Sequence, residues 1–168
     1  MLIRMANHTV YLSLGSNLGD RAANLHAAIA ALPEYGVRVK RISFMYETEP
    51  VDYLEQPWFL NCALEAETSL APLHLLHALR GIETRLGSQK QFAKGPRLLD
   101  MDILLYGDAT IDSPELQIPH PRMLLRNFVL APLAEIAPAL KHPNWTANVA
   151  EIYAASADAG QIKRFAAF

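Results

Sequence analysis

Two aspartates, Asp100 and Asp102, stand two residues apart within the apolar segment 98–106. A strand sends successive side chains to opposite faces, so both carboxylates point the same way, roughly 7 Å apart. In apolar surroundings the two groups repel each other and lose hydration, and a folded protein keeps them charged only beside a cation or donors. Mg²⁺ fits, because it takes one or two carboxylates from the protein and leaves its other positions to water and phosphates. The alternative is a solvated strand end at which both aspartates do nothing.

Several cations accompany the acid pair in the sequence. Arg97 lies directly upstream, and segment 88–96, which has no periodicity, carries Lys90 and Lys94. Positive charge beside paired acids fits a metal with a polyphosphate better than either sign of charge alone. A merely solvated basic loop is the alternative. Downstream, prolines on both sides of His120 hold its backbone outside helix and sheet, which makes His120 and Arg126 candidate phosphate contacts.

A second candidate platform lies on the alternating segment 58–68. Phe59 and Asn61 share one face, while Leu60, Cys62 and further apolar residues occupy the other. An aromatic ring followed two residues later by an amide can stack on a flat heterocycle and hydrogen-bond its edge. Phe128 is a candidate second wall. An exposed aromatic residue beside a surface asparagine is the alternative.

Helices and strands must position these side chains, and the pattern of the sequence predicts them. Apolar periodicity and turn residues predict strands at 9–14, 37–46, 58–68 and 98–106, helices beginning after Asp20 and after Ser69, and shorter helices at 130–136 and 147–155. A phase slip at 40–41 predicts a bulge. Segment 47–57 is a long loop with two prolines, and loops of that length are often functional.

Composition limits the class of protein. The 168 residues are 51% hydrophobic and 19% charged, which predicts one globular domain, 1–168, with a sizeable core. A net charge of −2 predicts no nucleic-acid partner, and the lack of an apolar window of about 18 residues predicts no membrane span. Cys62 is the only cysteine, so no internal disulfide can form. This suits a reducing compartment, and we therefore expect a cytoplasmic protein.

Five short motifs, in order along the chain, resemble one enzyme family. They are Gly-Ser-Asn at 15–17, Phe-Leu-Asn at 59–61, Gly-Pro-Arg-Leu-Leu-Asp-Met-Asp at 95–102, Pro-His-Pro-Arg at 119–122 and Arg-Asn-Phe-Val-Leu at 126–130. Together they closely resemble the 6-hydroxymethyl-7,8-dihydropterin pyrophosphokinases of folate biosynthesis. The resemblance implies a ferredoxin-like α+β fold and transfer of the β,γ-diphosphate of ATP to the pterin hydroxymethyl group, with release of AMP. We expect small-molecule substrates and a monomer.

The resemblance also assigns roles to residues. It implies that Asp100 and Asp102 hold two Mg²⁺ ions and act in catalysis together with Arg97. The residues implied for ATP are Glu83, Lys90, Arg97, Ile103, His120 and Arg126. The residues implied for the pterin are Gly15, Thr48, Pro50, Val51, Phe59, Asn61 and Phe128. Many members carry two arginines and a tryptophan where this chain has Ser88, Lys90 and Lys94. Lys90 can replace an arginine as a point charge but not as a bidentate fork.

Two other functions compete with this interpretation. A two-metal nucleotidyltransferase also pairs Gly-Ser with Asp-x-Asp, but there the Gly-Ser closely precedes the acids, whereas Gly15 and Ser16 here end the first strand. A ferredoxin-like module that binds a nucleotide without turnover is the non-enzyme alternative. It predicts that replacing Asp100 or Asp102 leaves ligand binding nearly intact.

Overall fold

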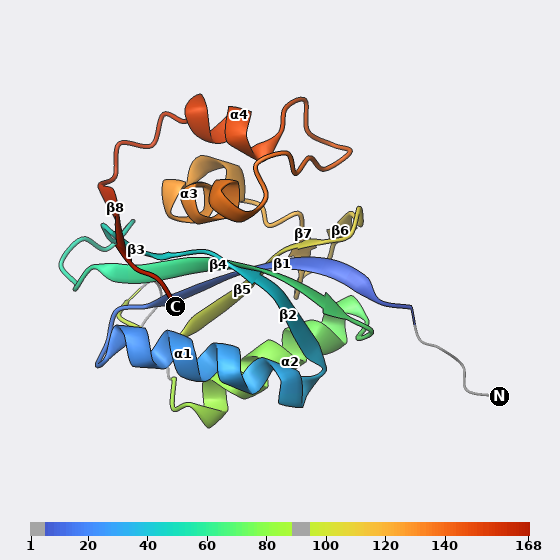
Figure 1. The fold of residues 1–168 in the computed structure, drawn as a ribbon, viewed down its shortest axis with the longest axis horizontal. Helices are drawn as coiled ribbons and strands as arrows, with labels where there is room; N and C mark the ends of the chain where they lie inside the picture. Colours follow the sequence, from blue (N-terminus) through green and yellow to red (C-terminus); the bar gives the residue numbers. More distant parts are fainter. Residues whose placement is uncertain (1–5, 89–94) are drawn as a thin grey trace.

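One antiparallel sheet lies between two layers of helices in the computed structural model, which describes residues 6–88 and 95–168 (Figure 1). The elements are β1 (His8–Ser16), α1 (Arg21–Ala31), the 3₁₀ helix η1 (Leu32–Tyr35), β2 (Val37–Ile42), β3 (Met45–Thr48), β4 (Phe59–Thr68), α2 (Pro72–Arg85), β5 (Asp100–Tyr106), β6 (Ile111–Asp112), β7 (Gln117–Ile118), the 3₁₀ helix η2 (Met123–Leu125), α3 (Asn127–Ile136), α4 (Val149–Ala154) and β8 (Ile162–Ala166).

The large sheet has the order β5-β1-β4-β3-β8, and β2 pairs with β4 beyond the end of β3. The chain therefore runs β-α-β-β-α-β, with β2 and β3 together filling the place of the second strand. This is the ferredoxin-like arrangement. The predicted fold class is confirmed.

The helices α1 and α2 cover one face of the sheet, below it in Figure 1. Alternate residues of β4 point to this layer, and Leu60, Cys62 and Leu64 are at most 1% exposed there. The stripe predicted for the second helix packs against them, since Leu75, Leu79 and Ile82 are fully buried. Burial raises the pKa of the Cys62 thiol, which suits the predicted role of a small hydrophobic residue.

The other face of the sheet carries α3, with α4 above it (Figure 1). A second apolar cluster forms there between the sheet and α3, and it includes Ala63 of β4, Leu104 of β5 and Leu133 of α3. This cluster covers only part of the face. At Phe59 and Asn61 of β4 and at Asp100 and Asp102 of β5, the same face borders a cavity instead.

Most local predictions are confirmed, and two are wrong. Asp20 caps α1, its carboxylate accepting from the Ala23 amide at 3.1 Å, and the register of β2 slips between Val39 and Arg41 as the predicted bulge requires. The helix expected to begin at a Ser69 cap begins instead at Pro72, a residue that suits the first helical position. Its N-cap is Ala71, which has no side-chain acceptor for a capping bond.

The strand predicted at 37–46 is two strands. Ser43 interrupts it, and its hydroxyl accepts from the Ala63 amide at 2.9 Å, which replaces a regular ladder contact. The C-terminal residues, in which the sequence showed no pattern, form β8 at the edge of the sheet beside β3.

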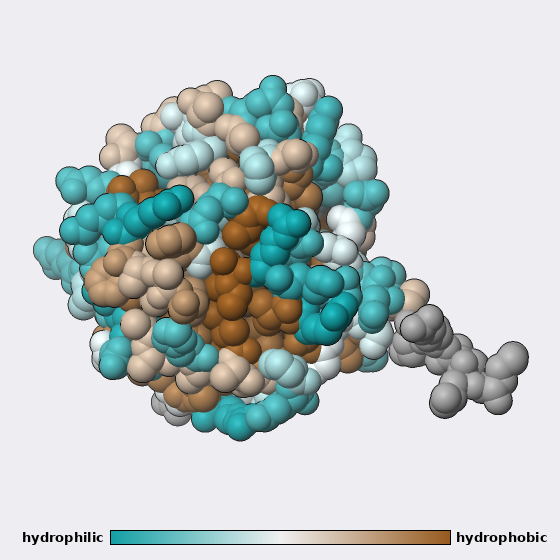
Figure 2. All heavy atoms as spheres, viewed as in Figure 1, coloured by the Kyte–Doolittle hydropathy of each residue, from teal (hydrophilic) through white to brown (hydrophobic). Residues whose placement is uncertain are grey.

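On the surface, Figure 2 shows hydrophobic side chains in the middle of one face, surrounded by hydrophilic ones. Exposed apolar residues include Ile42, Phe44 and Phe165. The Arg164 guanidinium lies 4.6 Å from the ring centroid of Phe44 and covers part of that side chain. Within 6–88 and 95–168, no helix has both the length and the apolar character that crossing a bilayer requires.

Candidate active site

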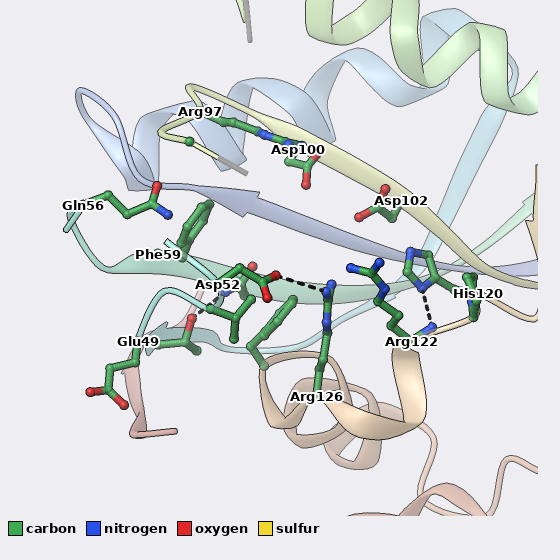
Figure 3. A pocket seen from close by; sticks show the side chains of 16 residues that line it. Glu49, Asp52, Gln56, Phe59, Arg97, Asp100, Asp102, His120, Arg122 and Arg126 are labelled. Carbon is green, nitrogen blue, oxygen red and sulfur yellow. Dashed lines mark hydrogen bonds and ion pairs between the residues drawn. The ribbon is translucent and has the colours of Figure 1, made fainter. Parts of the chain in front are cut away.

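A cavity of about 360 Å³ lies where the uncovered part of the sheet meets the start of α3 (Figure 3). Loop residues between β3 and β4 close one side, and the segment before α3 closes another. The lining residues are Thr48, Glu49, Val51, Asp52, Gln56, Phe59, Asn61, Gly95, Arg97, Asp100, Asp102, His120, Pro121, Arg122, Arg126 and Phe128.

The two acids of β5 project into this cavity from the same side, as the strand period predicted (Figure 3). Arg97 donates to Asp100 Oδ1 at 2.9 Å, whereas Asp102 lies 3.8 Å from the Arg80 guanidinium. Loss of solvent and the adjacent Asp100 charge raise the pKa of Asp102 to about 7. A cation bound between the two carboxylates would therefore stabilise their charged forms.

Glu83 and Arg80 of α2 hold the backbone between the two acids. The Met101 amide donates to Glu83 Oε2 at 2.8 Å, and Arg80 Nη1 donates to the Met101 carbonyl at 2.9 Å. Arg80 and Glu83 also form an ion pair at 2.8 Å. Because both α2 side chains hydrogen-bond the backbone of Met101, they fix the directions in which Asp100 and Asp102 point.

Across the cavity from the acids lie three cationic or polar side chains, His120, Arg122 and Arg126 (Figure 3). Burial and the Arg126 charge lower the pKa of His120, which favours its neutral imidazole. The Arg122 amide donates to His120 Nδ1 at 3.3 Å, which leaves the proton on Nε2. Arg126 lies 3.9 Å from Asp52 and stacks over Phe128 at 5.4 Å. This wall presents hydrogen-bond donors and positive charge to an anion.

The remaining wall is aromatic and amide in character. Asn61, 4% exposed, donates from Nδ2 to Thr48 Oγ1 at 2.7 Å. In the sheet, Gly15 lies between Asn61 of β4 and Asp100 of β5. A Cβ at Gly15 would come within 2.5 Å of Asn61 Oδ1, so only glycine leaves the amide in place. Phe59 lies beside them, two residues before Asn61 on the same strand face.

Asn17, buried at the end of β1, joins two loops of the cavity. Its Nδ2 donates to Gln56 Oε1 at 3.0 Å and to the Pro57 carbonyl at 2.9 Å. Its Oδ1 accepts from the Arg97 amide at 2.7 Å, and its own amide donates to the Arg97 carbonyl at 3.0 Å. One side chain thus fixes the loop before β4 against the loop before β5.

Residues 11–138 match the family model described as 7,8-dihydro-6-hydroxymethylpterin-pyrophosphokinase. The chain belongs to this family. It is therefore a pyrophosphokinase, an enzyme of one step of folate biosynthesis. The resemblance stated from the motifs is confirmed.

Individual relatives agree with the family assignment. The chain is 48% identical over 131 residues to the 2-amino-4-hydroxy-6-hydroxymethyldihydropteridine pyrophosphokinase of Bacillus subtilis, covering 77% of this chain and 78% of that protein. It is 44% identical over 138 residues to the enzyme of the same name from Pseudomonas aeruginosa, covering 80% and 84% of the two chains. A folic acid synthesis protein of Pneumocystis carinii is 44% identical over 147 residues, but the chain spans only 20% of its length.

Solved structures agree with the fold. A crystal structure of Plasmodium falciparum HPPK-DHPS superposes with a TM-score of 0.73 at 16% identity, over 90% of this chain and 46% of that chain. At this identity the similarity concerns the fold alone. The pyrophosphokinase chain thus spans less than half of that protein.

Most of the predicted site residues meet in the cavity of this pyrophosphokinase. Those that line it are Thr48, Val51, Phe59, Asn61, Arg97, Asp100, Asp102, His120, Arg126 and Phe128. Gly15 lies in the sheet beneath Asn61, and Pro50 lines a smaller neighbouring cavity of about 240 Å³. Lys90 lies outside the described residues.

Two residues predicted for ATP do not line the cavity. The Glu83 carboxylate accepts from the Met101 amide instead. Ile103 is 3% exposed and packs in the core below the sheet, because it faces away from Asp102.

Sequence reasoning missed several residues that line the cavity, among them Asp52, Gln56 and Arg122. The long loop 47–57 was the available signal for the first two. Asp52 has φ of 64°, a left-handed conformation that aspartate tolerates better than most residues. Arg122 lay within a quoted motif, and its part in the cationic wall required knowledge of the turn before η2.

Proposed function

We propose that this pyrophosphokinase transfers the β,γ-diphosphate of ATP to the hydroxymethyl group of 6-hydroxymethyl-7,8-dihydropterin. The observation that carries the proposal is the combination of two surfaces in one cavity. An acid pair faces arginines across a space suited to a metal-bound polyphosphate, and an aromatic and amide wall beside it suits a flat heterocycle. One cavity can therefore hold both substrates in contact.

The pterin is assigned to the wall of Phe59, Asn61 and Phe128. The two rings supply stacking surfaces, and stacking contributes about 1–3 kcal/mol per base in comparable sites. Asn61 keeps one N–H and its Oδ1 for a ligand after its bond to Thr48. Gly15 contributes by leaving room for that amide, and Val51 and Pro50 belong to the adjacent loop.

The triphosphate is assigned to the opposite side of the cavity. Arg126 and Arg122 offer charged donors, and His120 offers a neutral Nε2–H. Arg97 bonds Asp100 in this structure and can turn to a phosphate once a cation takes over the neutralisation of that acid. Burial and the Arg122 charge lower the pKa of Arg126, and an anionic ligand removes that repulsion.

Asp100 and Asp102 are assigned to the Mg²⁺ site. Two carboxylates suit Mg²⁺, which completes its shell with water and phosphate oxygens. Two bound ions would neutralise the triphosphate and lower the pKa of the pterin hydroxyl. The raised pKa of Asp102 fits this role, because a carboxylate without its cation holds a proton more tightly.

The reaction is an in-line displacement at the β-phosphorus. A bond forms between the hydroxymethyl oxygen and the β-phosphorus, and the proton of that hydroxyl group is released to solvent. The bond from the phosphorus to the α,β-bridging oxygen breaks, and AMP leaves with that oxygen. The protein positions both substrates and stabilises charge on the transferred group through its arginines. No described side chain has the geometry of a nucleophile for a covalent intermediate, and none is needed.

The deciding experiment follows the adenine nucleotides. The protein is incubated with ATP, Mg²⁺ and 6-hydroxymethyl-7,8-dihydropterin, and the products are separated by chromatography. We expect one AMP for each pterin diphosphate and no AMP when pterin is omitted or when a chelator removes Mg²⁺. ADP as product, or pyrophosphate together with an adenylated acceptor, would contradict the proposal and favour a kinase or nucleotidyltransferase.

Four further expectations accompany this function. The number of bound Mg²⁺ ions, the monomeric state, the cytoplasmic location and a single domain over 1–168 stay predictions. Titration of Mg²⁺ by calorimetry with a nonhydrolysable ATP analogue measures the first. Sedimentation measures the second. The predicted contact of Lys90 with ATP is testable by Lys90→Ala, with an increase in the KM for ATP as the expected result.

A further inference from the structure

The start of α3 lacks a cap of its own. Its N-cap residue is Arg126, which makes no side-chain capping bond, because a guanidinium has donors and no acceptor. Arg126 thus cannot cap the helix through its side chain, but its guanidinium can donate to an anion in the cavity. The two functional residues Arg126 and Phe128 stand on either side of Asn127, the first residue of this helix.

Asp158, 31 residues farther along the chain, supplies the missing acceptor. Its Oδ2 accepts from the Asn127 amide at 2.8 Å, and its carbonyl accepts from Asn127 Nδ2 at 3.2 Å. Two bonds therefore join the same pair of residues. The negative charge also lies at the positive end of the α3 dipole, where it is favourable.

The Asp158 carboxylate is itself held in place. Gly160 N donates to its Oδ1 at 2.9 Å, and Ser156 Oγ accepts from the Asp158 amide at 3.2 Å. Three residues on, Gln161 exchanges two bonds with Glu49: its amide donates to Glu49 Oε2 at 2.9 Å, and its carbonyl accepts from the Glu49 amide at 3.1 Å.

Segment 156–161 therefore connects two walls of the cavity. Figure 1 shows the chain running from α4 past α3 to β8 at the edge of the sheet. Within the segment, Asp158 bonds Asn127 of α3, the residue before Phe128. Gln161 bonds Glu49, the residue after Thr48 at the end of β3. Phe128 and Thr48 line the cavity on the side assigned to the pterin. The family match ends at residue 138, so this connection lies outside the matched region.

We propose that Asp158 is a positioning residue of the active site, which fixes Phe128 on the pterin side and Arg126 on the triphosphate side of the cavity through the start of α3. The proposal rests on the function proposed above. It makes a C-terminal segment beyond the family-matched region part of the machinery that aligns the two substrates.

Asp158→Ala is the main test, with Asp158→Asn as the conservative variant and Asn148→Ala as matched control. Asn148 caps α4 by accepting from the Glu151 amide at 2.9 Å, a bond of the same kind in the same region, and it does not line the cavity. We expect Asp158→Ala to lower kcat/KM for the pterin and to weaken pterin binding measured calorimetrically without ATP, each by about tenfold. Asp158→Asn keeps an acceptor and should lose about threefold or less.

The control separates positioning from stability. Both alanine variants remove one helix cap and should lower the melting temperature, but Asn148→Ala should keep wild-type kinetics. Equal kinetics in folded Asp158→Ala and Asn148→Ala would overturn the proposal. If Asp158→Ala does not fold, Asp158→Glu replaces it, because it keeps the negative charge at the start of α3 but moves the carboxylate one methylene group away from the Asn127 amide. Wild-type pterin affinity and wild-type kcat/KM in folded Asp158→Glu would overturn the proposal. Failure of the wild-type protein to release AMP would instead reject the proposed function and this inference with it.

Discussion

The two faces of the central sheet differ although the same strands build both. Below the sheet, β4 and β5 present apolar side chains that α1 and α2 bury almost completely. Above it, the same strands begin with Phe59, Asn61, Asp100 and Asp102, and α3 covers only the later residues of each strand. Successive residues of one strand thus serve opposite purposes. The difference predicts that stability and chemistry can be altered separately by substitutions at neighbouring residues of one strand.

The largest effect should come from the upper face. We expect Asp102→Asn to reduce kcat at least about 10²-fold, because it removes a preorganised charge from the site of diphosphate transfer. Steady-state kinetics at saturating ATP and pterin measure it. Near-wild-type turnover in this variant and in Asp100→Asn would exclude the acid pair from the mechanism.

Ile103, next to Asp102 on β5, should affect stability and not turnover. Ile103→Val removes one buried methyl group from the lower core and should cost about 1 kcal/mol of unfolding free energy. Denaturant unfolding measures that loss, and kcat should stay within about twofold of wild type. A large loss of kcat in Ile103→Val would show that the faces are coupled.

A smaller effect is expected for Gly15→Ala. The added Cβ would displace the Asn61 amide, so the KM for the pterin should rise about tenfold while the KM for ATP changes little. On the same strand, Val10→Ala alters the lower core and should lower the melting temperature without changing either KM. An unchanged pterin KM in Gly15→Ala would remove Asn61 from pterin binding.

The last effect concerns pH and is expected only in the absence of Mg²⁺. The pKa of Asp102 is raised above its unfolded value to about 7, so the folded protein binds an extra proton between about pH 4 and pH 7. Without Mg²⁺, this group therefore stabilises the fold at low pH, and its contribution is lost as pH rises through about 7. Thermal unfolding from pH 5 to 8 should show this decline in the wild type and not in Asp102→Asn. An identical slope in both proteins would assign the decline to other groups.

The sequence predicted the parts of the structure that depend on local pattern. Period two placed Asp100 with Asp102 and Phe59 with Asn61, and it placed Leu60 and Cys62 in the core. The capping preference of aspartate located the start of α1. These features need only the order of side chains along one element.

The missed features depend on bonds between distant residues. The Glu83 carboxylate accepts from the Met101 amide 18 residues away, and Asp158 accepts from the start of α3 across 31 residues. The strand β8 has a short and weakly apolar sequence, and its pairing with β3 alone defines it. Such contacts form only when the folded chain brings distant residues together, so no local sequence pattern predicts them.

The hydrogen bonds of Glu83 and Arg80 with the backbone of Met101 determine which substitutions position 101 can accept. Because the bonds reach the backbone amide and carbonyl, the identity of the side chain at position 101 does not enter them. That side chain has only to fill the apolar space below the sheet. Another apolar side chain of similar volume at position 101 should therefore leave the directions of the two flanking acids unchanged.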